Sequence, residues 1–240
     1  SSMPQSIWER LVRAAAQARQ QPLWLTTSWG STETAPANTF AHWQLDRAGV
    51  IGLPMQGVEV KFVPNGGKLE MRVRGPHIFP GYRDAPQATL DAFDDEGFYG
   101  MGDAGHLMDD ADPAQGIVFN GRVAEDFKLT TGTWVSVGTL RLQVISALAP
   151  WVVDAVITGH DRDQVGAMLF VTDAARQLQA PDLAQKILDG LRALQSAGGG
   201  SSQVPKRALV LPDMPSMQAG EITDKGYINQ RAVLARRADD

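Results

Sequence analysis

Two alternating runs separated by a glycine-rich turn constrain the fold of this chain more than any other feature. Residues 58–63 and 69–74 each alternate polar and apolar side chains, the period of two that is typical of half-buried strands. Between them stands Pro64-Asn65-Gly66-Gly67, and an Asn-Gly pair tolerates the positive φ angles of a tight hairpin turn. The pattern predicts an antiparallel hairpin. Because a lone hairpin is only marginally stable in water, it also predicts a larger sheet or small barrel around it.

The remaining signals divide the chain into two parts of different character. Before about residue 122 we expect a helix over 7–20, a short buried strand over 23–28, an acidic loop over 84–97 and a strand over 117–119. After it we expect helices over 139–148, 182–196 and 226–237 and strands over 151–158, 165–172 and 207–211. The fold class is therefore α+β: a β-rich, barrel-like part within residues 1–122, a boundary at 123–128, and a small mixed α+β domain over 129–240.

Composition excludes several classes of protein. The 240 residues are 43% hydrophobic, enough for a real core, but no apolar run approaches the roughly 18 residues of a membrane span. The net charge is −5, and residues 1–125 hold ten basic and fifteen acidic side chains, which argues against nucleic acid as a partner. Cysteine is absent, so disulfides and thiolate metal sites are excluded and a reducing, cytoplasmic location is expected.

The first segment that could carry chemistry is Trp29-Gly30-Ser31-Thr32-Glu33-Thr34. A glycine followed by hydroxyls and a carboxylate can bind anionic phosphate oxygens, and a hard cation such as Mg²⁺ prefers the carboxylate. An ordinary polar turn explains the same residues when they are taken alone.

Three further segments are of the same kind. Asp103, in Gly97-Phe98-Tyr99-Gly100-Met101-Gly102-Asp103, could accept hydrogen bonds from two sugar hydroxyls, or could belong to an ordinary turn. Gly121-Arg122 through Lys128 lies at the predicted boundary, where a solvated charged loop is the alternative to a ligand-contacting arginine. Gly220 to Gly226 could be a mobile arm that carries Lys225, or only the start of the last helix, capped by Thr223 or Asp224.

Together, and in this order, these segments resemble the motifs of the adenylate-forming superfamily of acyl- and aryl-CoA synthetases, luciferases and peptide-synthetase adenylation domains. Trp29-Gly30-Ser31-Thr32-Glu33 is similar to its aromatic-Gly-x-Thr-Glu motif, and Gly121–Lys128 to its hinge motif. The long middle signature of the superfamily is matched by Gly75-Pro76, Gly81-Tyr82, Pro86, Thr89, Phe93, Gly97-Phe98 and Gly102-Asp103. Within the superfamily the details are most similar to feruloyl-CoA synthases, notably over residues 30–36, 46–52, 121–138 and 220–234.

The resemblance implies an ATP-dependent reaction in two halves. A carboxylic acid, here an aromatic acid such as a hydroxycinnamate, attacks the α-phosphate of ATP to give an acyl-adenylate, and coenzyme A then displaces AMP. The implied substrates are the acid, ATP and CoA, with Mg²⁺ as the metal, and a homodimer is among the implied assemblies. A fatty acyl-CoA ligase, an adenylation domain that loads a carrier protein, and a non-catalytic nucleotide-binding or interaction module remain as alternatives.

The resemblance also implies a role for each motif residue. Thr32 would bind the α-phosphate and Glu33 would hold Mg²⁺, while Asp103 and Arg122 would bind the ribose. Trp29 would stand beside adenine, and Gly30 and Ser31 would line the edge of the acyl pocket. Glu125 would be the hinge residue, and Lys128 and Gly132 would line the CoA channel.

Two departures from the family pattern matter. The catalytic lysine motif normally reads Gly-Lys, but here it reads Gly220-Glu221, so Lys225 is the candidate replacement. If residues 222–225 coil helically, Lys225 would lie one turn from Glu221, on the same face; the alternative is that Lys225 is an ordinary solvated side chain. The Ser/Thr/Gly-rich phosphate loop of the family is not present, so a C-terminal fragment of a longer ligase, inactive by itself, is expected.

Overall fold

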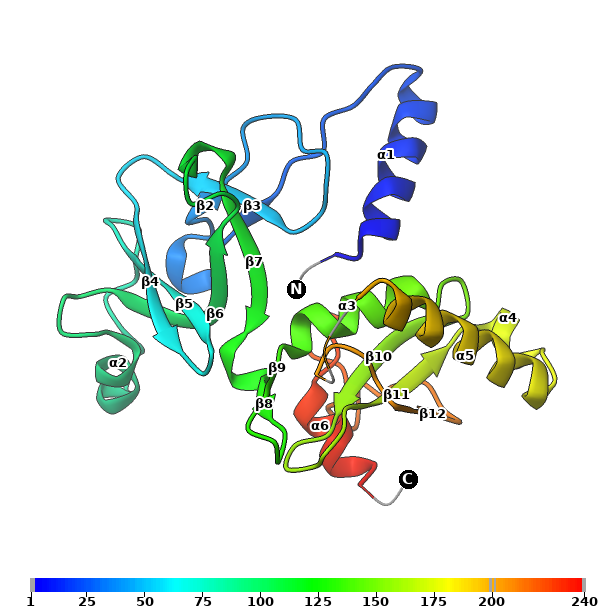
Figure 1. Cartoon of the computed structure of the whole chain (residues 1–240). Coiled ribbons are helices and arrows are strands. Elements are labelled where there is room, and N and C mark those ends of the chain that lie inside the picture. The colour runs from blue at the N-terminus through cyan, green and yellow to red at the C-terminus, as the bar shows by residue number, and fades with distance from the viewer. Residues whose placement is uncertain (1–2, 199, 201, 239–240) are drawn as a thin grey trace. The chain divides into compact units, whose positions relative to one another are not determined.

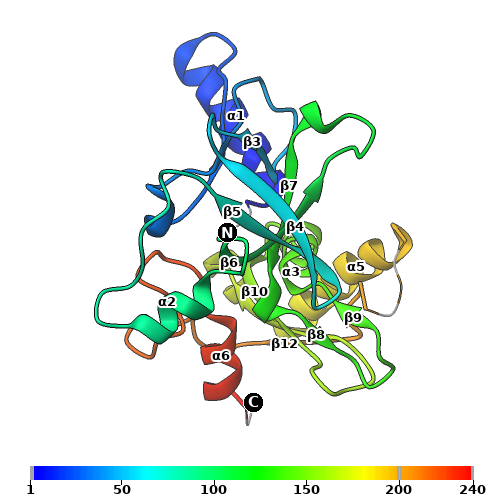
Figure 2. The same ribbon diagram turned by 90° about the vertical axis from the view of Figure 1, so that its left-hand side faces the viewer.

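The hairpin expected from the alternating runs is confirmed. In the computed structural model, which describes residues 3–198, 200 and 202–238, β4 (Glu59–Asn65) and β5 (Lys68–Arg74) pair antiparallel, with Asn65 opposite Lys68. The two turn residues, Gly66 and Gly67, have φ angles of 57° and 80°. Both angles suit a type I′ turn, whose twist matches that of the strands, and Figure 2 shows the resulting twisted pair.

The chain forms two units with separate hydrophobic cores, one ending at Ala124 and the other beginning at Glu125. The first unit is built on an antiparallel sheet in the order β1-β2-β3-β7-β6-β5-β4 (Figure 1). Its other strands are β1 (Ser28–Trp29), β2 (Thr39–Phe40), β3 (Val50–Pro54), β6 (Tyr99–Leu107) and β7 (Ile117–Arg122). Within the described residues no pairing joins β1 to β4, so the barrel-like expectation is corrected to an open seven-stranded sheet.

Several short elements complete the first unit. Helix α1 (Gln5–Arg19) begins after Pro4, close to the start expected from its apolar spacing. The strand expected over 23–28 is reduced to β1, since Trp24 lies 61% exposed rather than in the core. The loop expected over 84–97 contains helix α2 (Pro86–Ala92), which has a proline in its first turn, a position that suits proline because its missing N–H would have no partner there. Two single-turn 3₁₀ helices, η1 (Thr32–Thr34) and η2 (Pro113–Gln115), lie in the connections.

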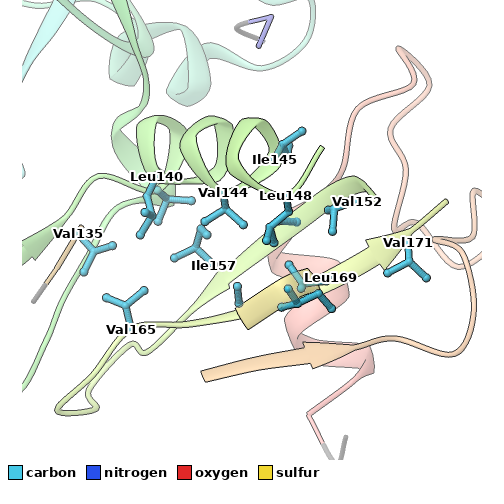
Figure 3. Packing of buried hydrophobic residues seen from close by; sticks show 14 of the residues in the cluster. Val135, Leu140, Val144, Ile145, Leu148, Val152, Ile157, Val165, Leu169 and Val171 are labelled. Carbon is cyan, nitrogen blue, oxygen red and sulfur yellow. The ribbon is translucent and has the colours of Figure 1, made fainter. Parts of the chain in front are cut away.

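The second unit has three layers around a mixed three-stranded sheet. Strands β10 (Val152–Thr158) and β11 (Gly166–Val171) are antiparallel, while β12 (Arg207–Val210) pairs parallel with β11. Alternate strand residues point to opposite faces. Ala155 and Leu169 belong to the cluster beneath α3 (Val137–Ala147) and α5 (Ala180–Ser196), shown in Figure 3, whereas Val156 and Phe170 pack with Val233 of α6 (Gln230–Arg236).

These helices and strands agree with the expected ones, except that α6 begins at Gln230 and not near 226. The segment before it is a turn, in which Gly226 has a φ of 80° and Asn229 caps the helix by accepting a hydrogen bond from the Ala232 N–H. The remaining elements are η3 (Val123–Glu125), β8 (Phe127–Lys128), β9 (Trp134–Val135) and α4 (Asp173–Arg176). Among the described residues, no helix combines the length and hydropathy that a membrane span requires.

Candidate functional site

The antiparallel pairing of β6 with β7 places Asp103 opposite Arg122. Nε of Arg122 lies 3.1 Å from Oδ1 of Asp103, and the indole N–H of Trp29 donates to Oδ2 at 2.8 Å. Asp103 is 5% exposed. Burial raises the pKa of the Asp103 carboxyl above its ordinary value, against the opposing effects of the Trp29 hydrogen bond and the Arg122 charge.

One oxygen of this buried carboxylate retains accepting capacity. Oδ1 makes no hydrogen bond to any residue that the structure describes, because the Arg122 contact is an ion pair without hydrogen-bond geometry. An unsatisfied buried acceptor is costly, so such an atom in a folded protein calls for an explanation. A hydroxyl donor supplied by a ligand would satisfy it.

Trp29 itself is part of the core of the first unit. Its side chain is 6% exposed and clusters with residues that include Ile51, Met71 and Tyr99. Its backbone carbonyl accepts from the Asn38 N–H at 2.7 Å, which joins the end of β1 to the residue just before β2. A position of this ring beside adenine stays a prediction.

The turn after Trp29 presents Thr32 and Glu33 on η1. The Ser31 N–H donates to Oγ1 of Thr34 at 2.8 Å, and the Thr34 N–H donates back to the Ser31 carbonyl at 3.1 Å. These reciprocal bonds close the turn and leave Thr32 exposed and Glu33 partly exposed. Ser31 and Thr34 therefore make the hydrogen bonds that close the turn, and the side chain of Thr32 is exposed on it.

Glu33 is held by an aromatic neighbour that the sequence analysis did not single out as a site residue. The Tyr82 hydroxyl donates to Oε1 of Glu33 at 3.2 Å and lies 3.2 Å from the hydroxyl of Tyr99. Burial raises the pKa of Tyr99 well above its ordinary value, so its phenol stays protonated and can donate. The only available signal was that Gly81-Tyr82 belongs to a motif of the resemblance.

The residues present offer a limited metal site. Among the described residues, no group of three or more His, Cys, Asp or Glu side chains is placed to hold a metal ion. A single carboxylate such as Glu33 nevertheless fits Mg²⁺, which is commonly bound by one or two carboxylates together with substrate phosphates and water.

In the second unit, Lys128 and Gly132 lie on the β8–β9 hairpin. Nζ of Lys128 lies 4.9 Å from the centroid of the Trp134 ring, a cation–π contact, and Gly132 has a φ of 81° where its N–H closes the turn onto Leu129. Glu125, the expected hinge residue, is exposed at the end of η3.

The structure corrects the expectation for residues 221–225. Thr223 donates to the Tyr227 carbonyl at 2.8 Å and Ile222 bridges Ile228, so the segment is a tight hairpin-like turn and not a helix. Lys225 is exposed within that turn, whereas Glu221 is fully buried. Glu221 and Lys225 therefore do not share a helical face, and the helical geometry expected for Lys225 is wrong.

The structure therefore brings together two sets of the expected residues within the first unit: Trp29 with Asp103 and Arg122, and Ser31 to Glu33 on η1. Tyr99 belongs to the same strand as Asp103 and reaches Glu33 through Tyr82, so the two sets are linked. Lys128, Gly132 and Lys225 belong to the other unit.

Comparison with known proteins gives a family match for the second unit. Residues 128–240 match the AMP-binding enzyme C-terminal domain. The long-chain-fatty-acid–[acyl-carrier-protein] ligase AEE15 of Arabidopsis thaliana is 26% identical over 232 residues, 90% of this chain and 32% of that protein. The medium-chain fatty-acid–CoA ligase of Escherichia coli is 24% identical over 244 residues, 95% of this chain and 40% of that protein.

The fold has solved counterparts. The adenylation domain of a carboxylate reductase from Mycobacterium chelonae superposes with a TM-score of 0.75 at 23% identity, over 96% of this chain and 36% of that chain. The chain thus spans only about a third of the length of the relatives that it matches. Residues 128–240 are thus similar to the C-terminal domain of AMP-binding enzymes, and the relatives that match most of the chain are named as acid ligases.

Proposed function

We propose that this chain works as part of an ATP-dependent acid–thiol ligase, in which it binds the nucleotide and carries the C-terminal domain. The observation that carries the proposal is the buried carboxylate of Asp103, which is held by Trp29 and paired with Arg122 while Oδ1 retains accepting capacity. A ribose offers vicinal hydroxyls, and a carboxylate is the acceptor that suits them.

The remaining roles follow from charge and exposure. Thr32 would donate its hydroxyl to the α-phosphate, and Glu33 would hold Mg²⁺, which neutralises phosphate charge as the acid attacks. Lys225, exposed in its turn, would supply a cation to the same reaction, and the β8–β9 hairpin with Lys128 and Gly132 would line the path of CoA.

For the acid we propose an aromatic substrate such as ferulate or a related hydroxycinnamate, on the strength of the motif details over residues 30–36 and 220–234. Two relatives give the alternatives specific support, since one is named a medium-chain fatty-acid–CoA ligase and another a long-chain-fatty-acid–[acyl-carrier-protein] ligase. In a longer protein that contains this chain, acid-dependent pyrophosphate release, followed by transfer to CoA or to a carrier protein, separates these classes when ferulate and a medium-chain fatty acid are compared. A non-catalytic binding module would give neither reaction.

The nucleotide site can be tested in this chain directly. NMR titration with AMP should shift amide signals of β6 and η1 in the wild type. Asp103→Asn should weaken AMP binding about tenfold or more, because the amide is uncharged and has one acceptor oxygen where the carboxylate has two. Asp109→Asn, an exposed neighbour in sequence, is the matched control and should bind AMP normally. Equal AMP affinity in all three proteins would contradict the assignment, as would an absence of binding by the wild type. Light scattering in the same samples tests the homodimer.

A further inference from the structure

We infer that Trp29 is a positioning residue for ribose recognition: its indole N–H fixes one oxygen of Asp103 and thereby reserves the other for a ribose hydroxyl. The inference rests on the proposed nucleotide site and deepens it. It assigns Trp29 a role through Asp103 that differs from a place beside adenine.

The hydrogen bond between Trp29 and Asp103 is buried and has a fixed direction. Nε1 of Trp29 donates to Oδ2 of Asp103 at 2.8 Å, between side chains that are 6% and 5% exposed. Indole has one donor and no acceptor, so this contact can have only one direction. It therefore occupies an accepting site on Oδ2 and leaves Oδ1 without a hydrogen bond from the described residues.

The indole of Trp29 is held rigidly in the core of the first unit. Trp29 belongs to the buried cluster that includes Ile51, Met71, Val73 and Ile117, and β1 holds its backbone opposite Thr39. A side chain confined in this way cannot follow a rotating carboxylate, so the carboxylate must keep the orientation that the indole dictates. Preorganisation of this kind avoids the cost of ordering the acceptor when a ligand arrives.

A fixed acceptor on Asp103 should make the site selective for ribonucleotides over deoxyribonucleotides. Arg122, whose side chain is 60% exposed, compensates part of the negative charge of Asp103. A site that presents a buried, fixed acceptor should reject a nucleotide that lacks the matching hydroxyl, because the acceptor would then be desolvated and unpaired. Trp29 should therefore affect the preference for a ribonucleotide over a deoxyribonucleotide more than it affects nucleotide binding in general.

The experiment compares the binding of AMP, 2′-deoxy-AMP and 3′-deoxy-AMP to the whole chain by NMR titration. The wild type should prefer AMP over at least one deoxynucleotide by about tenfold or more, the range expected for one hydrogen bond to a charged group. Trp29→Phe, which keeps an aromatic ring and removes the N–H, should lower that preference severalfold, because the affinity for AMP should fall more than the affinity for the same deoxynucleotide. Trp24→Phe is the matched control, since Trp24 is 61% exposed, and it should keep the wild-type preference.

A second measurement decides the hydrogen bond without any ligand. The indole N–H signal of Trp29 should move strongly in Asp103→Ala and lose its protection from exchange with solvent, while the Trp24 signal should not move. Thermal unfolding identifies any variant that fails to fold, and if Trp29→Phe does so, the Trp29 indole signal in Asp103→Ala tests the hydrogen bond instead.

The possible results separate the two proposals. An unchanged preference for AMP in a folded Trp29→Phe, or an unmoved Trp29 signal in Asp103→Ala, would overturn the role of Trp29 and leave the nucleotide site intact. An absence of AMP binding by the wild type would refute the proposed function and, with it, the ribose role inferred for Trp29.

Discussion

Gly30 separates the buried Trp29 from the turn that presents Thr32 and Glu33, and its lack of a side chain has a structural cause. A Cβ at this position would lie 1.8 Å from the carbonyl oxygen of Pro36 and 2.8 Å from Cα of Ala37. Backbone atoms cannot move aside as a flexible side chain can. Glycine is therefore needed at position 30 because the backbone of Pro36 and Ala37 passes too close for a side chain. This requirement holds whether or not Gly30 also lies beside an acyl group.

Gly30→Ala should consequently destabilise the chain by about 1–3 kcal/mol, the usual cost of forcing extra atoms into a packed site. Urea unfolding of the wild type and the variant measures this difference. Gly200→Ala is the control, since a Cβ there meets no atom within 4 Å, and its free energy of unfolding should stay within about 0.5 kcal/mol of wild type. A Gly30→Ala protein as stable as the control would contradict the close approach.

At the scale of elements, Glu221 anchors the turn that carries Lys225 to helix α6. Its fully buried carboxylate accepts from Nε of Arg237 at 2.7 Å, from Nη1 of Arg236 at 2.9 Å and from the Ser216 N–H at 2.8 Å. The Arg237 hydrogen bonds lower the pKa of Glu221 to about 2, against the opposing effect of burial. Glu221 is thus a structural anchor whose charge is neutralised within its own unit.

A lowered pKa makes the contribution of Glu221 to stability dependent on pH. The stabilisation is fully present above the ordinary pKa of 4.5 and is lost as the pH falls towards about 2. Glu221→Gln should therefore cost about 3 kcal/mol near pH 7, where Arg237 loses its counter-charge, and much less near pH 2.5. Unfolding of both proteins across this pH range measures the effect.

Asp224→Asn provides the comparison for that series, because Asp224 is an exposed carboxyl in the same turn. Its stability should follow the wild type at every pH. A difference between wild type and Glu221→Gln that stays constant from pH 7 to pH 2.5 would rule out the titration of Glu221 as the cause.

At the scale of the whole molecule, the two units have separate cores: the cluster around Met71 and Val73 in one, and the clusters around Leu169 and Phe170 in the other. We propose that residues 123–128, with Glu125, form a hinge between units that unfold independently. Glu221→Gln should then lower the hydrogen-exchange protection of β10–β12 and leave that of β4–β6 unchanged. An equal loss of protection in both units would contradict independence.

Local sequence patterns predicted many of the helices and strands but few of the strand pairings. The alternation around Gly66-Gly67 was sufficient for the β4–β5 hairpin, and the helical spacing of residues 182–196 for most of α5, because these signals act between residues close in sequence. The seven-stranded order could not be predicted in this way, since β3 pairs with β7 across the intervening hairpin. Helix α2 was missed because its residues lie within an acidic, loop-like stretch.

The sequence by itself determined the order of the motifs from which the site residues were predicted, and the tertiary structure decided what those residues contact. Trp29 and Asp103 are 74 residues apart, and only the packing of β1 and β6 in one unit brings the indole to the carboxylate. Glu221 stands where the resemblance places a catalytic lysine, and only the fold shows that it is buried against Arg237. The physical reason is common to both: turn and strand preferences act over a few residues, whereas burial and hydrogen-bond partners depend on where distant segments of the chain meet.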